Sequence, residues 1–215
     1  MCIRDRYGVE QNSVFDSLTA LDRTTLTEAP FDAPSCEFGY RDSVFKHALR
    51  DRAIVTSVTY RLSKQPIVNT AYLDVRNELA AMNVASPTIR DVRDAVVRVR
   101  TRKLPDPRVI GNAGSFFKNP IVTADQHDAL KALHPEMPAY AQKDGTHKLA
   151  AAWLIDQCGW KGHRRGDAGV HANQALVLVN YGAATGAEIL ELAYDIQASV
   201  LEKFNVELER EVNVW

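Results

Sequence analysis

Prolines at positions 105 and 107 divide the chain, and they constrain its fold more than any other feature. Upstream, Ser86-Pro87 is typical of a helix start, with serine as N-cap and proline in the first turn. Apolar residues then recur at helical spacing, at Ile89, Val92, Val96 and Val99. This helix must end before Leu104, because proline cannot continue it and disfavours helical geometry one residue earlier. We therefore expect a domain boundary there, with one part over residues 7–103 and another over 104–215.

Strand and helix patterns alternate along both parts, which predicts an α+β fold. Residues 14–20 and 54–62 are typical of strands, and residues 206–214 alternate like a closing strand. In the second of these strands, one predicted face comprises Ile54, Val58, Tyr60 and Leu62, interrupted by Thr56. The apolar run 175–179 predicts a buried strand, whereas 111–120 predicts a loop rich in glycine and asparagine.

Helix starts in the second part are indicated by capping-box spacing, in which Thr123 precedes Gln126 and Thr185 precedes Glu188. A helix face that begins a few residues after Thr185 comprises Ile189, Leu192, Ala193, Ile196 and Val200. A further buried helix face is predicted from Leu149, Ala150, Trp153 and Leu154.

Charge and cysteine content exclude several classes of function. The net charge is −1, so no overall field favours nucleic acid or an anionic membrane. No apolar run approaches the length of a membrane span. Cys2, Cys36 and Cys158 are too few and too far apart for a metal site or a disulfide framework, which favours a reducing cytoplasm.

The start of the chain lacks any turn, cap or periodic pattern over residues 1–6. We expect these residues to be non-native and the natural chain to begin upstream of Tyr7.

Four segments carry a resemblance to a known family. Residues 36–47 contain Tyr40-Arg41-Asp42-Ser43-Val44-Phe45-Lys46, and residues 103–120 contain Gly111-Asn112-Ala113-Gly114-Ser115-Phe116-Phe117-Lys118-Asn119-Pro120. The other two are residues 148–159 and 170–180. In this order and spacing they resemble the UDP-N-acetylenolpyruvoylglucosamine reductase family over nearly everything after Tyr7.

The resemblance implies a flavoenzyme of peptidoglycan precursor synthesis. NADPH reduces FAD, which passes hydride to UDP-N-acetylglucosamine enolpyruvate and yields UDP-N-acetylmuramate. Residues 7–103 would then be the end of an FAD-binding domain, contacting FAD through Tyr7, Gly8 and Arg100. Residues 104–215 would form the UDP-sugar domain of a cytoplasmic monomer. The glycine- and serine-rich flavin loops of the family are absent from this sequence.

Three residues are implied to be catalytic, each with a simpler alternative. Hydride addition to the enolpyruvyl β-carbon makes an enolate, which Arg41 would stabilise with a fork of donors. Alternatively, Tyr40-Arg41-Asp42 is a local ion pair beside a packed ring. Ser115 would protonate the α-carbon, or it only satisfies a tight glycine turn. Glu211 would assist at the enolate carbon, or it belongs to a solvated acidic face with Glu207 and Glu209.

Substrate contacts are implied for a larger group of polar residues, although each alone is typical of an ordinary surface. They are Tyr40, Tyr72, Lys103, Lys118, Asn119, Tyr140 and Gln174. His171 is interpreted as a structural hydrogen-bonding residue, and the arginines of 90–103 as a solvated helix face. One alternative function remains open, namely a UDP-sugar-binding module without flavin or catalysis.

Overall fold

The computed structural model describes residues 5–6 and 9–214. Tyr7, Gly8 and most of the predicted non-native start therefore lie outside the described residues. The chain divides into two compact units, Met1–Val99 and Arg100–Trp215, so the helix Ile89–Lys103 crosses the boundary and is described with the first unit. Within the described ranges, no helix is long and apolar enough to cross a membrane.

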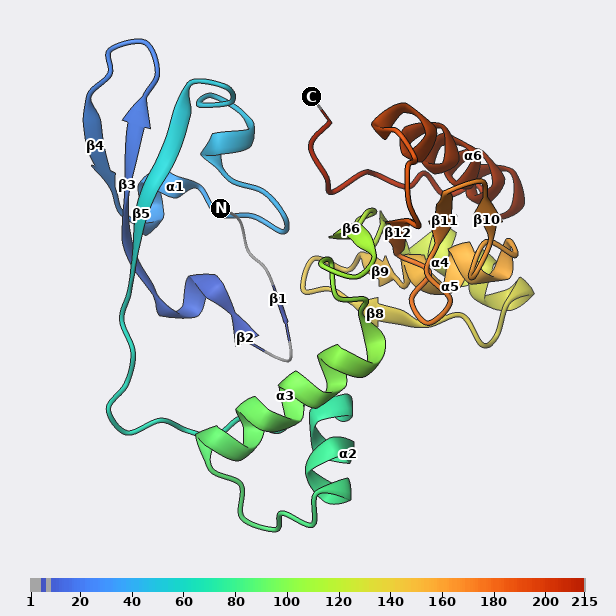
Figure 1. The fold of residues 1–215 in the computed structure, drawn as a ribbon. Coiled ribbons are helices and arrows are strands. Elements are labelled where there is room, and N and C mark those ends of the chain that lie inside the picture. The colour runs from blue at the N-terminus through green and yellow to red at the C-terminus, as the bar shows by residue number, and fades with distance from the viewer. Residues whose placement is uncertain (1–4, 7–8, 215) are drawn as a thin grey trace. The chain divides into compact units, whose positions relative to one another are not determined.

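The first unit contains a three-stranded antiparallel sheet and a pair of packed helices (Figure 1). Its elements are, in chain order, β1 (Asp5–Arg6), β2 (Val9–Glu10), a 3₁₀ helix η1 (Gln11–Val14), β3 (Phe15–Asp22), β4 (Glu28–Phe31), α1 (Ala33–Cys36), a 3₁₀ helix η2 (Val44–Lys46), β5 (Ala53–Tyr60), α2 (Leu73–Ala81) and α3 (Ile89–Lys103). β3 is central, between β4 and β5. A small core forms around Leu18, Ala20 and Cys36.

The predicted face of β5 is correct at Val58 but wrong at Ile54 and Tyr60, and a β-bulge interrupts the strand between Ile54 and Val58. Thr19 pairs with Ser57 but Ala20 pairs with Val55, so Thr56 is an extra residue without a partner opposite it. A bulge exchanges the two faces of a strand beyond it. The side chains packed on the core are consequently Ala53, Val55 and Val58, whereas Ile54 and Tyr60 are exposed.

The long helix α3 ends at Lys103, before Leu104, as predicted. Its start lies later than the predicted N-cap Ser86. Thr88 Oγ1 accepts a hydrogen bond from the Asp91 amide at 3.3 Å, and the Asp91 carboxylate accepts one from the Thr88 amide at 2.8 Å. This reciprocal cap starts the helix at Ile89, whose side chain is exposed. Of the rest of the predicted apolar face, Val92 and Val96 pack around Val75, Leu79 and Ala95, and Val99 is buried.

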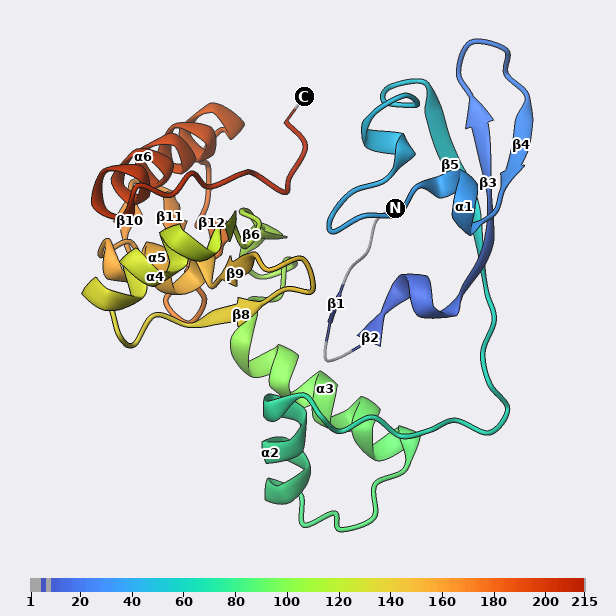
Figure 2. The ribbon, with the colours of Figure 1, turned by 180° about the vertical axis from the view of Figure 1, so that it is seen from behind.

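The second unit combines three helices with two small antiparallel sheets (Figure 2). Its elements are, in chain order, β6 (Gly111–Ser115), β7 (Ile121–Val122), α4 (Ala124–Leu133), β8 (Ala139–Ala141), β9 (His147–Leu149), α5 (Ala151–Gln157), β10 (Arg164–Arg165), β11 (Ala168–Val170), β12 (Val177–Asn180) and α6 (Gly186–Phe204). One sheet has the order β10-β11-β12-β6 and the other β7-β9-β8. The combination confirms the α+β prediction.

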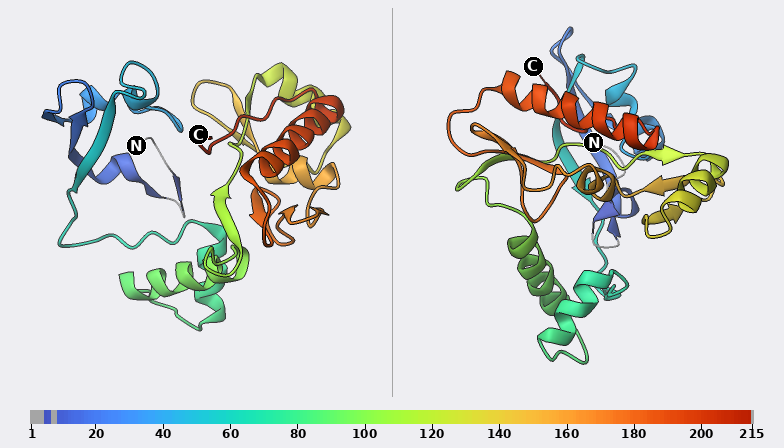
Figure 3. Two further views of the ribbon diagram at one scale, coloured as in Figure 1. Left: turned by 45° about the horizontal axis from the view of Figure 1, so that its top comes forward. Right: turned by 90° about the vertical axis from the view of Figure 1, so that its right-hand side faces the viewer.

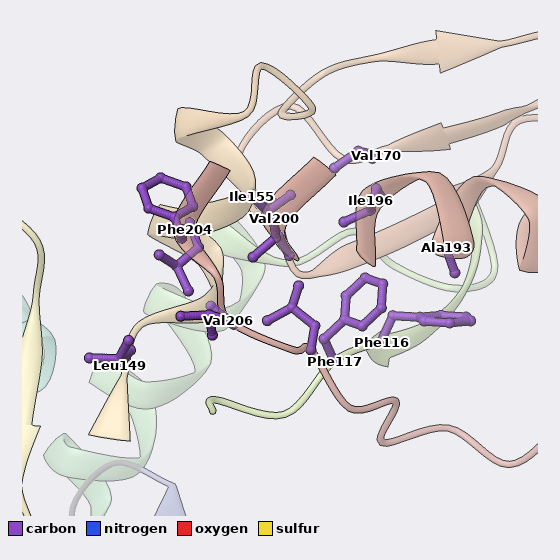
Figure 4. Close-up of a cluster of buried hydrophobic side chains, with 14 of the residues drawn as sticks. Phe116, Phe117, Leu149, Ile155, Val170, Ala193, Ile196, Val200, Phe204 and Val206 are labelled. Atoms are coloured by element: carbon purple, nitrogen blue, oxygen red, sulfur yellow. The ribbon is translucent and has the colours of Figure 1, made fainter. Parts of the chain in front are cut away.

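The helix α6 follows the predicted pattern and packs against β11 and β12 (Figure 3). Thr185 and Glu188 form the predicted capping box. Of the predicted apolar face, Leu192, Ala193, Ile196 and Val200 have no exposed surface. These side chains share one core with the two phenylalanines that follow β6 (Figure 4).

Three sequence predictions for this unit are wrong. Residues 111–115 form the strand β6 and not a loop, because they pair with β12. Residues 206–214 do not form a strand; a single bridge joins Arg210 to Phe117. Leu149 is buried in β9 and Ala150 is the N-cap of α5, so the predicted helix face mixed two elements.

A substitution at Gly169 should destabilise this unit. A Cβ at Gly169 would lie 2.8 Å from Cε2 of Tyr181 and 2.9 Å from the carbonyl oxygen of His163. Gly169→Ala should therefore lower the free energy of unfolding by about 1–3 kcal/mol. Gly186→Ala is the matched control, since a Cβ there meets nothing within 4 Å. Urea denaturation measures both, and equal stability of the two variants would contradict the prediction.

The turn that follows α3 contains an aspartate with a strongly lowered pKa. Arg108 donates to the Asp106 side chain from its guanidinium and from its amide, and these bonds lower the pKa to about 2. The stabilisation of the folded state by these bonds is therefore present above pH 3.8 and is lost as the pH falls through about 2. In Arg108→Gln the amide bond remains, so an NMR titration should show the Asp106 midpoint rising part of the way toward 3.8. An unchanged midpoint would exclude the guanidinium as the main cause.

Candidate functional site

The first unit presents Arg41 on a strained turn. Gly39 and Asp42 exchange two backbone hydrogen bonds of 3.0 Å, which places Tyr40 and Arg41 at the tip. Arg41 has φ of 55°, in the left-handed region that usually requires glycine or asparagine. Lys46 fixes this conformation, because its ammonium donates to the Arg41 carbonyl oxygen at 2.7 Å. Such strain persists where surrounding contacts impose it, and it is common at functional sites.

Asp42 has local partners next to this turn. Its carboxylate accepts from the Ser43 amide at 2.9 Å and lies 2.7 Å from Nε2 of His47. The His47 contact is the main cause that lowers the pKa of Asp42. These contacts order the turn from the carboxylate side, and Tyr40 beside Arg41 is half-buried.

In the second unit, Ser115 ends a strand that carries a glycine bulge. Asn112 pairs with Val179 and Ser115 with Val177, so two residues of β6 lie opposite one residue of β12. Gly114 accommodates the bulge with φ of 75°. The Asn112 side chain accepts from the Gly114 amide at 3.1 Å, which supports the bend. Ser115 therefore follows a glycine with positive φ, as its structural alternative expects. The same bend fixes the position of the Ser115 backbone, which its catalytic role would also need.

The C-terminal segment approaches β6 directly after Ser115. The Glu211 amide donates to the Phe116 carbonyl oxygen at 2.8 Å, and the Lys118 amide donates to the Glu209 carbonyl oxygen at 2.8 Å. Glu211 is therefore bonded through its backbone to the residue that follows Ser115. The structure brings these two predicted catalytic residues into neighbouring backbone positions, although they are far apart in the sequence.

Two residues predicted to contact the diphosphate already have protein partners. The Lys118 ammonium pairs with the Glu209 carboxylate. The Asn119 side-chain oxygen accepts from the Ala151 amide at 3.0 Å, at the first residue of α5. Asn119 thus satisfies a helix N-terminus that its own N-cap, Ala150, cannot satisfy with a side chain.

The other predicted substrate residues lie in different elements. Tyr72 is the N-cap of α2 in the first unit, and Lys103 is the last residue of α3. In the second unit, Tyr140 lies in β8 with 56% of its surface exposed. Gln174 accepts from the Leu176 amide at 3.4 Å, in the loop before β12. Substrate contacts for these residues stay predictions.

His171 has the environment of a structural residue. Its Nδ1 accepts from the Asn173 amide at 3.3 Å, and burial lowers the pKa of His171. A neutral acceptor held by the backbone suits the structural interpretation and not a general acid.

Sequence reasoning missed residues that hold the C-terminal segment. Glu209 is the partner of Lys118 across 91 positions, and the Gln197 side chain of α6 donates to the Leu208 carbonyl oxygen at 2.6 Å. No local pattern could pair residues so distant. The only available signal was the alternation of charge in residues 207–211, which by itself is typical of a solvated face.

The model of the UDP-N-acetylenolpyruvoylglucosamine reductase C-terminal domain matches residues 106–215, which is half of the chain. The chain belongs to this reductase family. The resemblance drawn from the four segments is thereby confirmed.

Relatives in this reductase family match the chain over most of its length. UDP-N-acetylenolpyruvoylglucosamine reductase from Burkholderia lata is 56% identical over 207 residues, covering 95% of this chain and 59% of the relative. The enzyme of that name from Pseudomonas aeruginosa is 53% identical and covers 97% and 61%, respectively. The chain therefore spans about 59% of the length of such reductases.

A solved reductase structure supports the fold. The crystal structure of UDP-N-acetylenolpyruvylglucosamine reductase from Thermus caldophilus matches with a TM-score of 0.58 at 24% identity. The match covers 98% of this chain and 56% of the Thermus caldophilus chain. At this identity the likeness concerns the arrangement of the chain and not its chemistry.

FAD is implied for the reductase family, and the contacts expected from this chain are Tyr7, Gly8 and Arg100. Of the three residues expected to contact FAD, Tyr7 and Gly8 lie outside the described residues. Arg100 is exposed on α3. A cofactor of this size needs a concave, mostly apolar site that one exposed guanidinium does not provide.

Proposed function

We propose that this chain is the substrate-reducing part of a UDP-N-acetylenolpyruvoylglucosamine reductase. In the protein at full family length, NADPH would provide the reducing equivalents and FAD would supply the hydride. The reaction would convert UDP-N-acetylglucosamine enolpyruvate to UDP-N-acetylmuramate for peptidoglycan. Residues 7–103 would complete the FAD domain and residues 104–215 would bind the UDP sugar.

The chemistry assigns separate tasks to the residues of this chain. Reduction of an enolpyruvyl double bond develops negative charge on the α-carbon and the carboxylate. Arg41 would bind that carboxylate with a bidentate fork, at a turn whose backbone is fixed by Lys46. Ser115 would donate a proton to the α-carbon, since even a weak acid suffices for a strongly basic enolate.

The carboxyl group of Glu211 would assist at the same carbon. A carboxylate near the carboxylate of the substrate would repel it, so Glu211 would act protonated or bridged to a donor. The observation that carries the proposal is the 2.8 Å bond between the Glu211 amide and the carbonyl oxygen of Phe116, the neighbour of Ser115. A module that only bound a UDP sugar would have no need to hold a proton donor and a carboxyl group on adjoining backbone segments.

Steady-state kinetics of the protein at the full length of its relatives test the proposal. We expect NADPH oxidation that depends on the enolpyruvyl substrate and forms UDP-N-acetylmuramate. Tight binding of the nucleotide sugar without turnover would support instead the alternative of a non-catalytic UDP-sugar-binding module.

A further inference from the structure

Residues 205–212 follow α6 and are held to the rest of the second unit by a single bridge, from Arg210 to Phe117, and by side-chain contacts. Val206 and Leu208 are buried in the core of the second unit. Side chains from α4 and α6 bind its backbone, since Gln126 donates to the Asn205 carbonyl oxygen at 2.8 Å and Gln197 to that of Leu208 at 2.6 Å. These contacts fix the first half of the segment, before the part that carries Glu211.

The second half of the segment is fixed from the side of β6. The amide of Lys118 donates to the carbonyl oxygen of Glu209, and the side chains of the same two residues form an ion pair. Two residues further, the Glu211 amide donates to the Phe116 carbonyl oxygen. Lys118 and Glu209 are thus joined twice, immediately beside the contact that places Glu211 near Ser115.

The two partners of this ion pair differ strongly in exposure. Only 15% of the Lys118 side chain is exposed, compared with 72% for Glu209. Taking an ammonium group out of water is costly unless an opposite charge compensates it. The carboxylate of Glu209 provides that compensation inside the protein, so the Lys118 ammonium does not need a substrate phosphate as its counter-ion.

We propose that Lys118 and Glu209 are a pair of positioning residues that set the backbone of Glu211 beside Ser115. This role replaces the diphosphate contact expected for Lys118. The inference rests on the proposed function, because it gives Glu211 and Ser115 their importance. The pair acts through the backbone contact of Glu211 and does not touch the reacting atoms.

A double-mutant cycle separates positioning from phosphate binding in the protein at full family length. Lys118→Met and Glu209→Gln each remove one charge while keeping the length of the side chain. For a positioning pair, each single variant should lower kcat about tenfold and leave KM for the UDP sugar nearly unchanged. The double variant should be no slower than the worse single variant, because both changes remove the same interaction.

A charge reversal extends the cycle, with Glu209→Lys as the single variant and Lys118→Glu/Glu209→Lys as the swap. The swap restores opposite charges and should recover part of kcat if the pair positions the segment. A matched control is the exposed ion pair of Lys161 and Asp156. Exchanging the charges of these two residues should leave kcat unchanged. If Lys118→Met raised KM and kept a normal kcat, while Glu209→Gln changed neither, the inference would be overturned in favour of a diphosphate contact.

Amide hydrogen exchange at Glu211 gives a readout that does not depend on activity. The bond from this amide to Phe116 should open more often in both single variants than in the unmutated protein, with exchange about tenfold faster. In the swap it should open less often than in the single variants. If the unmutated protein reduced no substrate, the proposed function would fail while this measurement still tested the pair. Unchanged exchange in Lys118→Met and Glu209→Gln would overturn the inference whatever the activity.

Discussion

Replacing Ser115 with alanine should slow reduction of the substrate by about 10²–10⁴-fold, the usual contribution of a general acid. The enolate would then lack its proton source at the α-carbon. The step in which NADPH reduces the protein makes no enolate, so it should proceed at its normal rate. In rapid-mixing experiments, NADPH oxidation without substrate should match the unmutated protein, whereas reoxidation by the enolpyruvyl substrate should be slow.

The bulge in β6 makes the control for this variant important. Ser115 contributes to a bend that Gly114 and Asn112 maintain, and the alanine variant keeps that backbone. Ser57→Ala removes an exposed hydroxyl from β5 and should change neither step. Equal slowing of both steps in Ser115→Ala would mean that Ser115 has a structural role only.

Arg41→Lys should lower turnover by about 10²–10³-fold, as expected for loss of a donor to a developing oxyanion. The variant keeps the positive charge but loses the planar fork that binds two carboxylate oxygens. Both residues carry a Cβ, so the backbone cost of φ near 55° is the same in each, and Lys46 still holds the carbonyl oxygen. The substitution therefore isolates the geometry of the guanidinium.

A second arginine of the same unit provides the comparison for Arg41. Arg50 is exposed and lies 3.8 Å from Asp51, so Arg50→Lys should leave turnover unchanged. Steady-state rates at saturating substrate measure both variants. Near-normal turnover of Arg41→Lys would remove Arg41 from the proposed chemistry.

Elements with a strong local pattern were predictable from the sequence. The helix α6 has its capping box at Thr185 and its buried face as expected, because both depend on residues three or four positions apart. The end of α3 follows from Pro105, which cannot continue a helix. In these cases local chemistry and tertiary packing favour the same structure.

Elements that depend on distant partners were not predictable. The strand β6 contains two glycines and an asparagine, which favour a loop until β12 pairs with it. Residues 206–214 alternate like a strand but have only a single bridge, to Phe117, and side-chain contacts to their backbone. In β5, the extra residue Thr56 puts Ile54 on the opposite face from Val58, and no local signal marks a bulge at this position.

The same distinction applies to the candidate site. Short motifs indicated Arg41 and Ser115, because a motif keeps its residues together in the sequence. The pairing of Lys118 with Glu209 spans 91 positions and required the fold to become visible. Motifs therefore predicted which residues could do the chemistry, whereas the structure supplied what holds them.

Deuterium incorporation from the solvent tests the proposed reduction of the enolpyruvyl double bond. The protein at full family length is incubated with NADPH and UDP-N-acetylglucosamine enolpyruvate in heavy water, and the product is examined by NMR. We expect UDP-N-acetylmuramate with a solvent-derived deuterium at the α-carbon, delivered through the Ser115 hydroxyl. Recovery of unchanged substrate, although the protein binds it, would exclude this reaction.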